Sequence, residues 1–129
     1  MKKSKLVTTQ TTKGVRRSNL IKNPVLLKCP FHLIVIGPAD DFDTICNRYR
    51  LAIDKSDDCL GEVWKVTNDK TGDSYFVVHI NEVTVGTIAH EATHLTDWYF
   101  STIGEREPSF EMRAYITQAF CQWIEQGLL

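Results

Sequence analysis

The amino-acid sequence predicts a small α+β domain. Its 129 residues suffice for one domain, its strand-like segments lie before residue 81, and two long helical segments follow them. The predicted order is strand, helix, strand, strand, helix, helix. This order favours a small antiparallel or mixed sheet packed on the last two helices over a doubly wound sheet.

The first half of the domain is predicted to contain one strand and one helix. Residues 31–36 form an apolar, β-prone run, which predicts a buried strand that ends at Gly37 and Pro38. An amphipathic helix is expected over residues 41–53, because apolar side chains recur there at helical spacing. These side chains are Phe42, Ile45, Cys46 and Tyr49.

The second half is predicted to hold a hairpin followed by two helices. Residues 62–67 and 74–80 read as strands on either side of a polar turn with Gly72. A long helix is expected over residues 83–102, and a last helix over residues 107–125. The aromatic side chains of these helices fall at helical spacings and are predicted to lie in the core; they are Trp98, Tyr99, Phe100, Phe110, Phe120 and Trp123.

Charge divides the chain into a basic polar arm, residues 1–24, and a domain, residues 25–129. The first 39 residues carry eight basic and no acidic residues, whereas residues 40–129 carry seven basic and sixteen acidic residues. The arm is a candidate for weak contact with nucleic acid or another polyanion. A solvated tail, or a strand that pairs with the acidic domain, explains the same pattern, and no aromatic side chain lies among these charges for base stacking.

The cysteines and the N-terminus favour a cytoplasmic protein. No apolar stretch follows the basic N-terminus as a secretory signal requires, and no run approaches the roughly 18–20 residues that cross a membrane. The four cysteines contain no C-x-x-C pair, so we expect reduced thiols rather than a cysteine zinc site.

The most informative motif is H-E-x-x-H at residues 90–94, inside the predicted long helix. At about 100° per residue, His90 and His94 lie on one helix face, where two imidazoles can bind one Zn²⁺. Glu91 lies at the flank of that face, where it can act as general base on water rather than join the histidines as a third ligand. The alternative is that both histidines are ordinary helix residues and Glu91 is a surface acid.

A catalytic zinc site normally has three protein ligands and an open position. The downstream acids are Asp97, Glu105, Glu107 and Glu111. Glu111 is the best candidate, because the last helix should fold back on the motif helix, with the small Ala114 allowing close contact. Asp97 remains open as a ligand, or as a hydrogen-bond partner of a ligand imidazole.

The H-E-x-x-H motif followed by Glu111-Met112-Arg113-Ala114 resembles the gluzincin metallopeptidases, in which such a glutamate is the third zinc ligand. Several of those families have aspartate where this chain has Tyr115. Residues 84–129 also resemble small zincin-type proteins encoded by phages and prophages, which would place the protein in a bacterial host cytosol. The metzincin extension is absent, since no histidine follows His94.

The resemblance implies a zinc-dependent metallopeptidase acting on a peptide or protein substrate. Glu91 would serve as general base, and Tyr115 is the first choice for stabilising the oxyanion. Zincins present an edge strand for an extended peptide, and residues 74–80 are the expected strand. The rival reading is a non-enzymatic zinc-binding protein on the same scaffold, such as a phage-type inhibitor, adaptor or assembly component.

Overall fold

The computed structural model describes residues 19–21, 31–56, 58–67 and 70–129. Within them the chain forms four strands and three helices, and it is an α+β domain as predicted. The elements are β1 (Leu20–Ile21), β2 (His32–Ile36), α1 (Phe42–Tyr49), β3 (Gly61–Thr67), β4 (Ser74–Ile80), α2 (Val85–Thr102) and α3 (Phe110–Leu128).

The four strands form one mixed sheet in the order β1-β2-β4-β3. β2 runs parallel to β4, whereas β1 pairs with β2 and β3 pairs with β4 in antiparallel fashion. β4 is therefore an interior strand, and the prediction that residues 74–80 form an exposed edge is wrong. β3 is the edge strand on that side of the sheet, and its residues are only partly buried or exposed.

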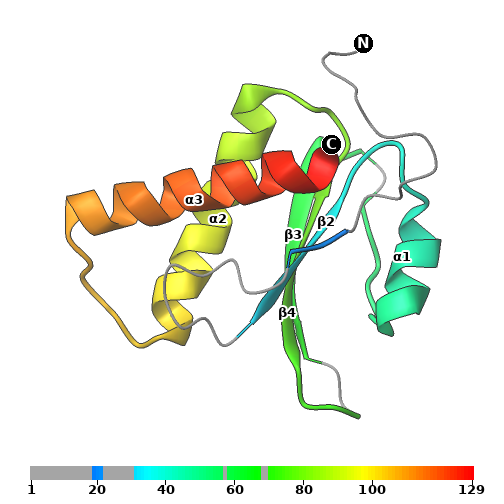
Figure 1. Ribbon diagram of the computed structural model, residues 1–129, viewed down its shortest axis with the longest axis horizontal. Coiled ribbons are helices and arrows are strands. Elements are labelled where there is room, and N and C mark those ends of the chain that lie inside the picture. Colours follow the sequence, from blue (N-terminus) through cyan, green and yellow to red (C-terminus); the bar gives the residue numbers. More distant parts are fainter. Residues whose placement is uncertain (1–18, 22–30, 57, 68–69) are drawn as a thin grey trace.

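The domain has three layers, with α2 and α3 on one face of the sheet and α1 on the other (Figure 1). Neighbouring residues of a strand point to opposite faces of the sheet. The same strands therefore contribute side chains to a core on each face. Val35, Phe76 and Val78 join the core under α2 and α3, and Ile34 and Val77 join the core under α1. Of the helix aromatics, Tyr99, Phe100 and Phe120 are buried, and Trp98 and Trp123 pack against them.

α1 is shorter than the predicted helix over residues 41–53. It ends at Tyr49 because Arg50 adopts a left-handed conformation, with φ of 57° and ψ of 48°. The backbone N–H of Leu51 then donates to the carbonyl of Cys46, which satisfies a carbonyl at the helix end. Leaving the helix here allows Leu51 to pack into the core under α1.

Part of the predicted arm, residues 19–21, belongs to the sheet. The amide of buried Asn19 donates to the Val35 carbonyl at 2.9 Å and to Asp40 at 3.1 Å. These bonds attach β1 to the turn after β2. Residues 1–18, which hold most of the arm's positive charge, lie outside the described residues.

The two long helices begin at side-chain caps. Thr84 accepts a hydrogen bond from the backbone N–H of Thr87 at the start of α2, and Ser109 accepts one from Met112 at the start of α3. α3 thus begins three residues later than predicted, and Phe110 in its first turn is 93% exposed rather than in the core. No helix in the described part of the chain is both long and apolar enough to cross a membrane.

α3 crosses α2 (Figure 1), and polar as well as apolar side chains join the two helices. The hydroxyl groups of Thr96 and Thr117 lie 3.0 Å apart, and Arg113 donates to Asp97 at 2.5 Å. Ala114 is exposed, so the predicted close helix contact at that residue is wrong. These contacts join α3 to the motif helix beside the apolar core that the two helices share.

Candidate metal centre

One face of α2 gathers three potential metal-binding side chains. Ligand atoms of His90, Glu91 and His94 all lie within 4.8 Å of one another. The two imidazole Nε2 atoms are 3.3 Å apart. Two donors at zinc-like distances of about 2.0–2.1 Å, separated by a tetrahedral angle, stand roughly 3.3–3.4 Å apart. The histidine pair therefore has the spacing that a single metal ion requires, and the group can hold one.

Both histidines are exposed, so the face they form is open to solvent. With no metal bound, one neutral ring can donate its Nε2 proton to the other, so the pair needs no further partner to persist. An exposed pair leaves room for water or a substrate group beside a bound ion.

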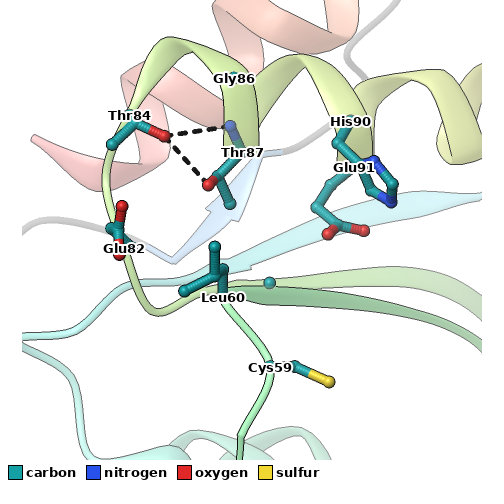
Figure 2. A pocket seen from close by; sticks show the side chains of 9 residues that line it. Cys59, Leu60, Glu82, Thr84, Gly86, Thr87, His90 and Glu91 are labelled. Atoms are coloured by element: carbon teal, nitrogen blue, oxygen red, sulfur yellow. Dashed lines mark hydrogen bonds between the residues drawn. The ribbon is translucent and has the colours of Figure 1, made fainter.

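Glu91 lies between α2 and the edge of the sheet (Figure 2). It is only 5% exposed, and its carboxylate makes no hydrogen bond with the residues that the structure describes. The interpretation of Glu91 as a surface acid is therefore wrong. Burial raises the pKa of the Glu91 carboxyl, and the nearby rings of His90 and His94 act in the opposite direction.

The place occupied by Glu91 exists because β3 begins with glycine. A Cβ added to Gly61 would lie 2.8 Å from Glu91 Oε2, 3.0 Å from Glu91 Cγ and 3.1 Å from Thr87 Cγ2. Any larger residue would displace the carboxylate. Sequence analysis assigned no role to Gly61, although a glycine at the start of a strand can signal a close approach of another group.

A pocket of about 460 Å³ extends from the metal-binding group along the first turn of α2 (Figure 2). Its walls come from the segment before β3, the β4–α2 connection and α2. The lining residues are Cys59, Leu60, Gly61, Glu82, Thr84, Gly86, Thr87, His90 and Glu91. The sequence gives no signal for most of them. Cys59, Leu60, Glu82 and Thr84 lie in connections, where no periodic pattern marks a site residue.

The remaining predicted site residues lie on or against α3. Glu111 is exposed in its first turn and is not part of the metal-binding group found among the described residues. Tyr115 is 63% exposed. Asp97 accepts a hydrogen bond from Arg113 instead of from a histidine ring. The roles of Glu111 as third ligand, Tyr115 as oxyanion donor and Asp97 as partner of a ligand stay predictions.

The three cysteines within the described residues, Cys46, Cys59 and Cys121, form no disulfide. Burial raises the pKa of the Cys46 thiol and of the Cys121 thiol. Neither belongs to the group that can hold a metal. The metal-binding chemistry of the described chain is thus concentrated in the H-E-x-x-H helix.

The fold and the site define an α+β domain in which a single helix presents a histidine–glutamate–histidine group able to hold a metal ion. No protein-family model, curated protein or solved structure matches the chain.

Replacing Gly61 with alanine is expected to destabilise the fold by about 1–3 kcal/mol, as overpacking usually does. The added methyl group would push Glu91 and Thr87 out of their present positions. Urea denaturation at neutral pH measures the change. The matched control is Gly86→Ala, in the same pocket, where an added Cβ meets nothing within 4 Å. Alanine there should stabilise the helix by up to about 1 kcal/mol. Equal effects of the two substitutions would contradict the tight packing of Glu91 on β3.

Proposed function

We propose that the protein is a zinc-dependent hydrolase of peptide bonds, built on a small zincin-like domain. The observation that carries the proposal is the 3.3 Å separation of the His90 and His94 Nε2 atoms beside a buried, unpaired Glu91. Two imidazoles and a flanking carboxylate on one helix are an arrangement that supports metal-assisted hydrolysis.

The donors suit zinc better than a hard cation. Imidazole nitrogen is a common ligand of Zn²⁺, whereas Mg²⁺ and Ca²⁺ prefer oxygen donors. His90 and His94 would hold the ion. Glu111 of α3 is the proposed third protein ligand, and because its side chain is exposed and lies outside the group formed by the two histidines and Glu91, it would have to move toward the ion on binding. When bound, zinc polarises a carbonyl group and lowers the pKa of water at the site.

Glu91 is the proposed general base. Its carboxylate is held close to both histidines, is shielded from bulk solvent and has no hydrogen-bond partner among the described residues that would compete for a proton. Burial raises the pKa of this carboxyl, which makes it a better proton acceptor than an exposed glutamate. Glu91 would take a proton from the attacking water and pass it to the leaving amine. Tyr115 is the proposed donor to the oxyanion.

The first test is metal content and metal-dependent hydrolysis of the full-length protein. We expect one zinc per chain by elemental analysis and cleavage of an internally quenched peptide library. A chelator should abolish the cleavage, and added zinc should restore it. The control is His90→Ala/His94→Ala, which should hydrolyse no peptide under any condition.

The outcomes distinguish a zinc-dependent hydrolase from a non-enzymatic zinc-binding protein. Stoichiometric zinc without cleavage of any peptide or of casein would favour the non-enzymatic metal-binding protein. A protein that binds no zinc, or that cleaves peptides equally well in a chelator, would overturn the proposed function.

A further inference from the structure

We propose that the pocket beside the metal-binding group binds a cationic side chain, arginine or lysine, and that Glu82 determines this preference. The assignment of the pocket as a substrate subsite rests on the proposed hydrolase function. Binding of a cation by the pocket does not depend on the proposed hydrolase function, because it requires neither metal nor catalysis.

The pocket has a fixed frame. The backbone N–H groups of Asn81 and Glu82 both donate to the Leu60 carbonyl, at 2.8 and 3.1 Å, and the Asn81 amide donates to the Cys59 carbonyl at 3.1 Å. Thr84 caps α2 immediately afterwards. The residues that line the two sides are thus tied together before any ligand arrives, and little ordering is needed on binding.

Glu82 supplies a free negative charge at one end of this frame. Its carboxylate has no hydrogen bond or ion pair with the described residues, and no lysine or arginine lines the pocket. In the view of Figure 2, Leu60 separates Glu82 from His90 and Glu91. A group bound near the metal site that extends along this pocket would pass Leu60 on its way to Glu82.

Leu60 supplies an apolar surface between the two ends. It is the aliphatic side chain of the lining, and it is 55% exposed. An exposed aliphatic group followed by the Glu82 carboxylate matches a side chain that has an apolar stem and a charged tip. The second carboxylate of the lining, Glu91, lies on the other side of Leu60, beside His90. Lysine and arginine have this form, because their methylene stems pack on apolar surface while the cationic head stays hydrated or paired. A purely aliphatic ligand would gain nothing from the Glu82 carboxylate, and an acidic one would be repelled by it.

The N-terminus of α2 also faces the pocket and contributes a partial positive charge of about half a unit. That charge is offset in part by Thr84, whose hydroxyl accepts from the Thr87 N–H. The full negative charge of Glu82 exceeds the remaining partial positive charge of the helix N-terminus. The end of the pocket at Glu82 is therefore negative, and it is the end farther from the metal-binding group.

The test uses a matched pair of probes, n-butylguanidinium and its neutral isostere n-butylurea. Each is titrated into the full-length, metal-free protein while the backbone amide resonances of Gly61 and Gly86 are followed by NMR. We expect saturable shifts with n-butylguanidinium and at least about tenfold weaker binding of n-butylurea, as a charge-assisted hydrogen bond provides. Glu82→Gln should remove the difference between the probes. Glu125→Gln, which changes an exposed acid at the far end of α3, should preserve it.

Peptides extend the same comparison to catalysis. If the zinc-loaded protein cleaves a peptide that contains arginine, its kcat/KM should fall at least about tenfold when citrulline replaces that arginine, and Glu82→Gln should abolish this preference. Equal binding of the two probes, or a preference unchanged in Glu82→Gln, overturns the cation pocket. Probe discrimination without any peptide cleavage would retain the pocket and count only against the proposed hydrolase.

Discussion

Replacing Glu91 with glutamine is expected to lower kcat for peptide hydrolysis by about 10²–10⁴-fold, the usual contribution of general acid–base catalysis. Glutamine keeps the shape of the side chain but cannot accept the proton. Because His90 and His94 are unchanged, the zinc content should remain one per chain. The measurement pairs steady-state kinetics with elemental analysis of the same preparation.

Stability distinguishes this loss from misfolding. Glu91 is buried and has no hydrogen-bond partner among the described residues, so its charged form carries a desolvation cost in the folded state. Burial raises its pKa, and the charged carboxylate therefore opposes folding at pH values above that pKa. Glutamine removes the charge, so the metal-free variant should resist urea at pH 8 at least as well as the wild type.

Two results would contradict the role of Glu91. If zinc were lost together with activity, Glu91 would be a metal ligand, as its distance from both histidines also allows. If zinc and activity were both retained, the general base would be another group. Glu125→Gln is the control, because it removes a carboxylate of the same type from an exposed position of α3.

The sequence was sufficient to predict the histidine–glutamate–histidine group because the group belongs to one helix. Helical geometry alone places residues four apart on the same face, and no tertiary contact is needed to bring His90 and His94 together. Helices and strands were predictable for a similar reason. Apolar residues recur every 3.6 residues in a helix and every 2 residues in a strand, and both patterns can be seen within a short segment. The α+β class followed from them, whereas the choice between an antiparallel and a mixed sheet stayed open.

The orientation of α3 could not be read in the same way. Ile116, Phe120 and Ile124 are buried against the sheet and α2, and they fix the rotation of the helix. Glu111 lies five residues before Ile116, about 140° around the helix axis, so it points toward solvent. Spacing shows that Glu111 and Ala114 share a face, but packing decides which way that face is turned.

Strand order was also beyond local patterns. The predicted hairpin made β3 and β4 neighbours in the sheet. It did not show which of these two strands pairs with β2. Burial of every residue from Phe76 to Ile80 is typical of an interior strand with a parallel neighbour, and β2 is that neighbour. The pocket depends on this order, because β3 as the edge strand brings Gly61 under Glu91.

Single alanine substitutions of His90 and His94 are expected to weaken zinc binding by more than about 100-fold each. Loss of a partner that only supports a metal ligand costs about 10–100-fold, and loss of the ligand itself removes a direct bond. Competition with a chromogenic zinc chelator measures the affinity. Both histidines are exposed, so the metal-free variants should unfold at the same urea concentration as the wild type.

The same assay identifies the third ligand. Glu111→Ala should weaken zinc binding as strongly as the histidine substitutions, whereas Asp97→Ala should leave it unchanged. Asp97 forms an exposed ion pair with Arg113, so its removal should change stability by less than about 1 kcal/mol. If zinc were retained in Glu111→Ala but lost in Asp97→Ala, Asp97 and not Glu111 would be the third ligand. Zinc could also be retained in both variants and lost in Glu91→Gln. His90, Glu91 and His94 would then be the complete set of protein ligands, and Glu91 would not be the general base.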